Sequence, residues 1–227
     1  MYSFDFSRSF PVQYSSFLHL TMRRLLPLLF ITFLLSACNG ESEQARKDYA
    51  LAQQYSQGAG VEKNPGKAFE FLVKASDEGS AKAALDLGYL YLQGAGVTKD
   101  TVKAIQYFQL SAKRGNADAS YNLGLAYVHG DGVTKDLKKA ATWFTQSALL
   151  DDAGAQFNLG LMYLNGEGVV KNPITAYAWF TLASEKDYQG AKGILSIAER
   201  EITPDQALEA QQAIDKLRRT IKAPAQK

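Results

Sequence analysis

Hydrophobic and polar positions between about residues 45 and 190 follow a helical spacing that recurs every 36 residues. Most units carry a Leu-Gly pair followed by a tyrosine on the same helical face. The copies are Leu87-Gly88 with Tyr91, Leu123-Gly124 with Tyr127, and Leu159-Gly160 with Tyr163. Glycine inside a helix costs about 1 kcal/mol relative to alanine, so its recurrence predicts a close backbone approach between packed helices. The pattern predicts the first helix of each unit.

A second helix is predicted after it, with a polar cap at its start and a bulky pair of side chains in its middle. The caps are Asn64, Asp100, Asp136 and Asn172, and the pairs are Phe71-Leu72, Tyr107-Phe108, Trp143-Phe144 and Trp179-Phe180. Gly79 and Gly115 suit the left-handed residue that follows a helix, and Asp151 and Asp187 take their places later. Ser80, Asn116 and Asp152 are predicted to cap the next first helix.

A Gly-x-Gly-Val loop separates the two helices of each unit. The copies begin at Gly58, Gly94, Gly130 and Gly166. A phosphate-binding loop would need a preceding strand and a Lys-Ser/Thr pair, whereas glycine readily supplies a tight turn between antiparallel helices. A period of this length is typical of a solenoid, in which each unit packs on its neighbours. We therefore predict an all-α fold, an α-solenoid of four helix-turn-helix repeats over residues 45–190.

Residues 191–222 are predicted to form capping helices, followed by a tail at 223–227. The first-helix pattern continues from Ala191 to about Ile202. The sequence Thr203-Pro204-Asp205-Gln206 has the form of a capping box with proline at the first helical position. It is expected to open a polar helix that ends near Thr220 and closes the last open face of the solenoid.

The third unit resembles the Sel-1-like repeat, a longer-loop relative of the tetratricopeptide repeat. The resemblance rests on the segment Ala119 to Val133, then Asp136, Lys139-Ala140 and Trp143-Phe144, and it recurs four times. It implies a scaffold or adaptor for other proteins. Some secreted members of this family have a disulfide in each repeat and have been linked to penicillin binding and weak β-lactam hydrolysis. This chain has a single cysteine, so those functions transfer poorly to it.

The first part of the chain reads as a secretory signal. Arg23-Arg24 precede an apolar run from Leu25 to Leu35, which is shorter than the roughly 20 residues needed to span a bilayer. Residues 1–21 show no repeat, so Met22 is the better candidate for the true start, with a signal peptide at about 22–37. The stretch Leu35-Ser36-Ala37-Cys38 resembles a bacterial lipobox. An ordinary signal peptide with a chance cysteine is the alternative.

The lipobox resemblance implies cleavage before Cys38 and lipid chains on that residue, which together would anchor the protein durably. Residues 38–44 would then form a tether, and at about 3.3–3.6 Å per residue its six polar residues reach roughly 20 Å. Asn39 is not the aspartate associated with retention in the inner membrane of enteric bacteria. We therefore expect a bacterial envelope protein, lipid-anchored in the outer membrane and facing the periplasm.

Charge argues against a nucleic-acid partner. The chain has 25 basic and 23 acidic residues. Residues 1–37 account for three arginines and one aspartate, so the mature chain would carry equal numbers of each sign. A nucleic-acid binder is expected to keep a basic stripe. Other envelope proteins are the expected partners.

The sequence offers little material for catalysis. His129 is the one histidine after residue 37, at the predicted end of a first helix. One histidine supplies neither a Ser-His-Asp set nor a multi-histidine metal site. We expect no enzyme activity, no cofactor and no metal. A secreted hydrolase of the β-lactamase-like branch and a peptidoglycan- or glycan-binding module are the alternative functions.

A partner is expected on the concave side of the solenoid, which the first helices usually line. Removing the predicted core positions leaves nine candidates: Asp86, Tyr89, Gln93, Asn122, Leu125, His129, Asn158, Leu161 and Asn165. Asn122 and Asn158 could bond the backbone of an extended peptide, or they could bond neighbouring helices. The residues alone leave both possibilities open.

Overall fold

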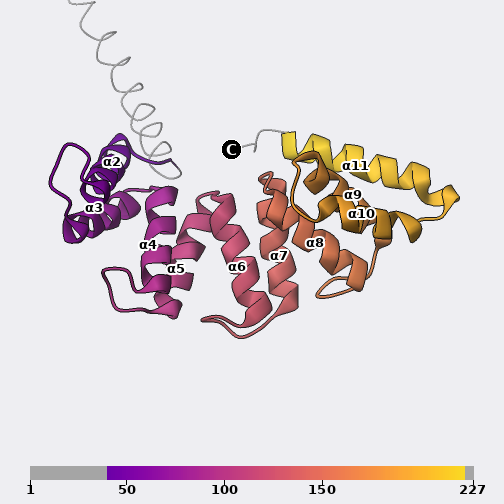
Figure 1. Ribbon diagram of the computed structural model, residues 1–227, viewed down its shortest axis with the longest axis horizontal. Helices are drawn as coiled ribbons and strands as arrows, with labels where there is room; N and C mark the ends of the chain where they lie inside the picture. Colours follow the sequence, from indigo (N-terminus) through magenta and orange to yellow (C-terminus); the bar gives the residue numbers. More distant parts are fainter. Residues whose placement is uncertain (1–39, 223–227) are drawn as a thin grey trace, which may run out of the picture. The chain divides into compact units, whose positions relative to one another are not determined.

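The computed structural model describes residues 40–222 and shows the predicted array of helix pairs (Figure 1). The first helices of the four units are α2 (Glu43–Gln57), α4 (Ala81–Gln93), α6 (Ala117–His129) and α8 (Ala153–Asn165). The second helices are α3 (Pro65–Asp77), α5 (Thr101–Lys113), α7 (Leu137–Leu149) and α9 (Pro173–Glu185). Three further elements follow: α10 (Ala191–Arg200), the short 3₁₀ helix η1 (Pro204–Gln206) and α11 (Ala207–Lys222). The all-helical solenoid of four repeats is confirmed.

The seven predicted caps form at the starts of α3 to α9, and Ser42, which was not predicted, caps α2 in the same way. The cap side chain of α2 to α9 accepts a hydrogen bond from the backbone N–H three residues later, over distances of 2.6–3.4 Å. Because the first N–H groups of a helix have no partner within the helix, these caps satisfy a donor that would otherwise be lost. Local sequence thus fixes where each helix begins.

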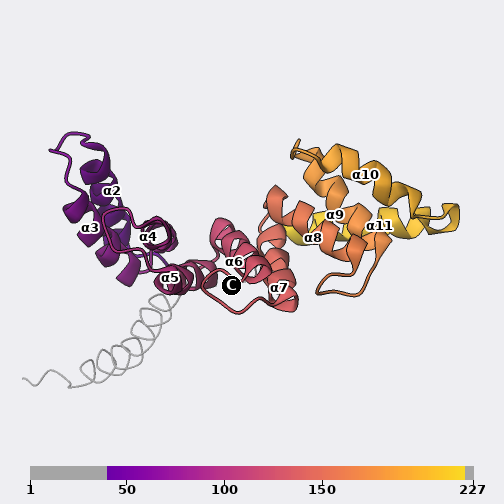
Figure 2. The same cartoon turned by 60° about the horizontal axis from the view of Figure 1, so that its bottom comes forward.

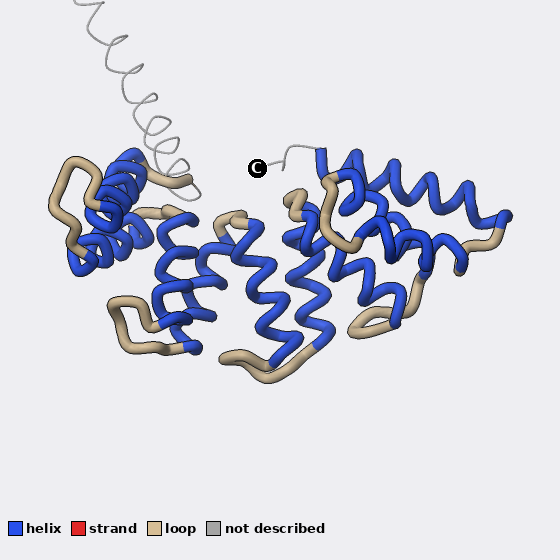
Figure 3. The backbone as a smooth tube through the Cα atoms, in the orientation of Figure 1, coloured by secondary structure: helices blue, strands red, loops and turns tan. Residues whose placement is uncertain are grey.

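The glycine loops are turns, as predicted (Figure 3). Both glycines of each copy have positive φ, between 71° and 85°, which side chains rarely tolerate. Each loop is closed by the same hydrogen bond, from the N–H of the second-helix cap to the carbonyl of the first-helix tyrosine. The pairs are Asn64 with Tyr55, Asp100 with Tyr91, Asp136 with Tyr127 and Asn172 with Tyr163, at 2.8–2.9 Å.

The glycines inside the first helices make room for aromatic rings. A Cβ added at Gly124 would lie 2.5 Å from the ring of Phe144, and Gly88 and Gly160 stand in the same relation to Phe108 and Phe180. The recurrence of glycine was expected to allow a close backbone approach between packed helices, and the group that lies nearest to each glycine is a phenylalanine side chain of the second helix. Each phenylalanine ring packs directly on the helix backbone at the glycine, and a side chain at that position would overlap with the ring. Clusters of buried residues then span the joints between successive units.

The second helices end at residues in the left-handed conformation. Gly79 and Gly115 have φ of 106° and 84°, and Asp151 and Asp187, which replace them, have φ of 72° and 53°. Aspartate is one of the few residues with a side chain that enters this region with modest strain. The aspartates therefore keep the geometry of the glycines.

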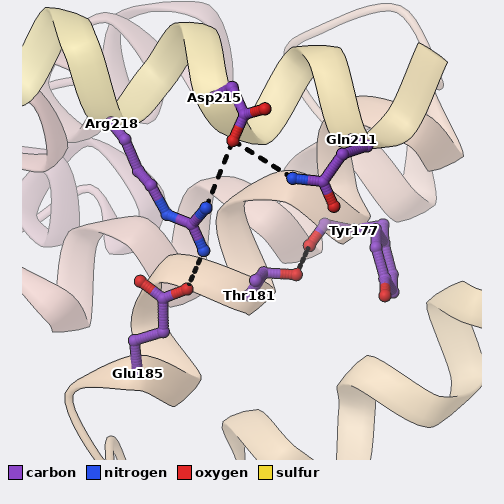
Figure 4. A network of polar contacts seen from close by, with 6 residues as sticks. All are labelled: Tyr177, Thr181, Glu185, Gln211, Asp215 and Arg218. Atoms are coloured by element: carbon purple, nitrogen blue, oxygen red, sulfur yellow. Dashed lines mark hydrogen bonds and ion pairs between the residues drawn. The ribbon is translucent and has the colours of Figure 1, made fainter. Parts of the chain in front are cut away.

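The C-terminal helices pack on the last repeat. The predicted box at Thr203 is present, but it opens the 3₁₀ turn η1 before α11 begins. Viewed from another direction, α10 and α11 both lie beside α9 (Figure 2). In α11, Ala210 and Ile214 are buried. Arg218 pairs with Glu185 of α9 and, at 3.2 Å, with Asp215 of its own helix (Figure 4).

The predicted signal peptide, Cys38 and the predicted tail at 223–227 lie outside the described residues. Between residues 40 and 222 no helix has both the length and the apolar character that crossing a bilayer requires.

Candidate partner-binding surface

The nine candidate residues lie on α4, α6 and α8, three to a helix and in matching positions. We call this set the first-helix surface. Gln93, His129 and Asn165 are exposed at the last position of their helices, next to the glycine that ends each one. The other six are half-buried. The exposed row is therefore open to a partner, whereas the half-buried rows share their contacts with the solenoid.

One row forms hydrogen bonds between neighbouring units. The Tyr49 hydroxyl donates to Asp86 Oδ2 at 3.0 Å. Asn122 Nδ2 donates to the Tyr89 hydroxyl at 2.8 Å, and Asn158 Nδ2 to that of Tyr121 at 3.4 Å. The asparagines thus bond neighbouring helices, which was the second of the two possibilities.

Tyr49 and Tyr121 are members of this row that sequence reasoning missed. They lie 72 residues apart and so occupy the same place in the first and third units. Because 72 residues are two repeat lengths, the matching tyrosines could have been recognised from the sequence as members of this row. The second unit has Leu85 there, and Tyr89, one turn further along α4, supplies the hydroxyl instead. Within residues 40–222, the hydrogen bonds of Asn122 and Asn158 are all donated from Nδ2, and neither Oδ1 accepts one.

Asp86 is the charged member of the row and is only half-exposed. Burial raises the pKa of its carboxyl above the usual value, and the hydrogen bond from Tyr49 opposes that shift. Burial, followed by the nearby Asp86 carboxylate, raises the pKa of Tyr49 to about 12. Tyr49 therefore keeps its proton at neutral pH and remains the donor of this hydrogen bond.

The middle row is mainly apolar and rests on the core. The ring of Tyr89 meets that of Phe108 edge to face, with centroids 5.3 Å apart. Leu125 and Leu161 pack against the buried clusters of the third and fourth units. Aromatic and apolar groups of this kind can bury a partner's side chains.

A cavity of about 340 Å³ opens at one end of the first-helix surface. Its walls come from α2, α3, α4 and the loop after α4, and they include Asp86 and Tyr89. The cavity is therefore the place where the structure brings two predicted site residues together with groups from the first unit. His129 lies outside this cavity, on α6 of the third unit. Within the described range, no three His, Cys, Asp or Glu side chains gather as metal ligands would.

The comparisons with known proteins agree with this architecture. The model of the Sel1 repeat matches residues 48–80, 81–116, 117–152 and 153–188. A crystal structure of a protective antigen from uropathogenic Escherichia coli, described as having an SLR fold, is 32% identical with a TM-score of 0.65. The match covers 81% of this chain and 41% of that one.

A Sel1 repeat protein from Oxalobacter formigenes is also 32% identical with a TM-score of 0.65, over 67% of this chain and 44% of that one. This chain thus spans less than half the length of either structure. Among curated proteins, none matches the sequence. The four matched repeats cover more than half of the chain and coincide with the four helix pairs. The chain belongs to the Sel1 repeat family.

Proposed function

We propose that this protein is a lipid-anchored scaffold that binds other proteins of a bacterial cell envelope through its first-helix surface. Sel1-repeat solenoids are typically protein–protein interaction modules, and extended repeat arrays offer long binding surfaces. The observation that carries the proposal is the first-helix surface itself. It combines an exposed polar row, an apolar row and the amide oxygens of Asn122 and Asn158 on the first helices of three successive units.

The anchor is proposed on Cys38, in the outer membrane and facing the periplasm. Support comes from the lipobox-like sequence and from the absence of any other cysteine in the chain. Cys38→Ser should block processing and release the protein from the membrane fraction, because the serine hydroxyl cannot form the thioether. Mass spectrometry of the mature N-terminus and membrane fractionation measure both effects. A normally processed, membrane-bound variant would refute the anchor.

Photo-cross-linking in intact cells tests the binding surface. A cross-linking residue at Asn165, which is exposed at the end of α8, should capture one dominant envelope protein. The control is the same residue at Gln106, exposed on the second helix α5. Capture of glycan strands, or equal capture at both positions, would contradict the proposal.

The proposal assigns no catalytic step to the chain. The alternative function is hydrolysis of β-lactams, which can be measured directly with the chromogenic substrate nitrocefin. Purified protein should leave nitrocefin unchanged beyond the buffer rate, and saturable hydrolysis that follows the protein through purification would overturn this assignment.

A further inference from the structure

We propose that the cavity between the first two repeats binds an arginine side chain from an extended segment of the partner protein. This inference rests on the proposed function and assigns a chemistry to one end of the first-helix surface. The first joint of the solenoid differs from the next two in that its glycine loop is not packed against the preceding unit.

The cavity exists because one glycine loop stands away from the preceding unit. At the second joint, a Cβ added to Gly132 would lie 2.8 Å from Thr101 Cγ2, on the first turn of α5. At the third joint, Gly168 lies against the carbonyl of Leu137 on the first turn of α7. At the first joint, a Cβ on the equivalent Gly96 meets no atom of the described residues within 4 Å. The loop therefore leaves space beside α3 that the other joints fill.

The walls of this space suit the stem of a long side chain. Ala68 and Leu72 of α3 are buried and form an apolar base, and Phe69 and Tyr89 present aromatic rings to it. The volume of about 340 Å³ lies at the lower end of the range for ligand pockets, about 300–1,000 Å³. Such a pocket can bury the three methylene groups of an arginine while its head reaches a polar wall.

Asp86 supplies the charge that selects a cation. Of the three matching positions on α4, α6 and α8, it is the acidic one, because Asn122 and Asn158 stand in the others. Its Oδ2 accepts from the Tyr49 hydroxyl, and no lysine or arginine of residues 40–222 forms an ion pair with it. A half-buried carboxylate without a cation is costly, and an incoming cation would offset that cost.

The remaining groups favour arginine over lysine. The groups that line the cavity from α2 are neutral: Gln53, Ser56 and Gln57. A guanidinium can donate to the free Oδ1 of Asp86 and to these oxygens at once, and its plane can stack on the ring of Tyr89 or Phe69. A lysine ammonium offers a point charge without the planar fork.

The test is titration of the purified, isotope-labelled protein with N-acetyl-arginine methylamide, followed by the backbone amide signals. Saturable chemical-shift changes at Gln53, Ala95 and Gly96 are expected. The corresponding lysine probe, acetylated on its α-amine, should bind several-fold more weakly, and the neutral citrulline analogue should cause no change. Absence of saturable shifts at these residues, or equal binding of citrulline, would overturn the proposal.

Two variants separate charge from cavity. Asp86→Asn should weaken binding of the arginine probe at least tenfold, and Tyr49 can still donate to the new amide oxygen, so the fold is kept. Adding Asn122→Asp to this variant restores the net charge at the matching position of the next unit. At that second joint, the glycine loop is packed against the preceding unit. Binding should remain lost, and recovery with the double variant would show that charge alone, without the cavity, binds the probe and would contradict the proposal.

The outcomes also distinguish this inference from the proposed function. If Asn165 captures an envelope protein but the arginine probe leaves the cavity signals unmoved, the cavity assignment fails and the scaffold stands. If the probe binds and Asn165 captures no more than Gln106, the proposed function fails and the cavity assignment stands.

Discussion

At the scale of single residues, the contact between a helix glycine and a phenylalanine ring decides how the two helices of a unit meet. The ring of Phe144 covers Gly124 closely enough that even a methyl group has no room. The opposite case is Gly193 in α10, where an added Cβ would meet no atom of the described residues within 4 Å. The two glycines share a helical conformation and differ in what lies over them.

Gly124→Ala should therefore destabilise the protein by about 1–3 kcal/mol, because overpacking outweighs the gain of about 1 kcal/mol in helix propensity. Gly193→Ala should stabilise it by up to about 1 kcal/mol, since only the propensity term remains. Urea unfolding of both variants checks the pair. Equal effects of the same sign would contradict the packing account.

Asp86 makes a second residue-scale prediction. Because burial raises its pKa, the folded state binds this proton more readily than the unfolded state does. Its charge therefore lowers stability at pH values above the folded pKa, and this loss disappears as the pH falls through that value. Asp86→Asn should be more stable than wild type at pH 7, with the difference shrinking toward pH 4. Urea titrations at the two pH values measure it, and a difference that grows on acidification would contradict the assignment.

At the scale of elements, the helices are defined by local signals that act within a few residues. Asn172 caps α9 by accepting from the N–H of Thr175 at 2.9 Å, and Pro173 follows at the first helical position. Asn172→Ala should lower the free energy of unfolding by about 1 kcal/mol, because that N–H loses its partner. The neighbouring Val170 is 87% exposed, and Val170→Ala should change stability by less than about 0.5 kcal/mol. Thermal or urea unfolding compares the two, and equal losses would argue against the cap.

The same scale shows what the sequence could predict. Caps, glycine turns and left-handed helix ends depend on residues three or four apart, and these were predictable. The bonds of Tyr49 with Asp86 and of Asn122 with Tyr89 join residues 37 and 33 apart, so they depend on how units stack. The cavity beside Gly96 depends on how far one loop lies from α3, although that loop has the same motif as its neighbours. No local pattern records that distance.

At the scale of the whole solenoid, each unit is stabilised by its neighbours, and the last one relies on α11. Ile214 is 4% exposed, whereas Leu208 of the same helix is 69% exposed. Ile214→Ala should cost about 2–5 kcal/mol, and Leu208→Ala less than about 0.5 kcal/mol. Because α11 contacts α9 and α7 and the first unit contacts only its neighbours, amide exchange should accelerate in α9, α10 and α11 and stay unchanged in α2 and α3. Uniform acceleration along the array would contradict this nearest-neighbour account.

The most direct test of the central claim compares two charge-matched double variants in their affinity for the envelope protein captured at Asn165. His129→Lys with Asn165→Lys alters exposed positions of the first-helix surface, and lysine suits the C-terminal end of a helix. Gln106→Lys with Thr142→Lys places the same charges at exposed, equally spaced positions of α5 and α7. The account predicts a Kd at least tenfold higher for the first pair and unchanged for the second. Equal affinities for both, or a loss confined to the second pair, would contradict it.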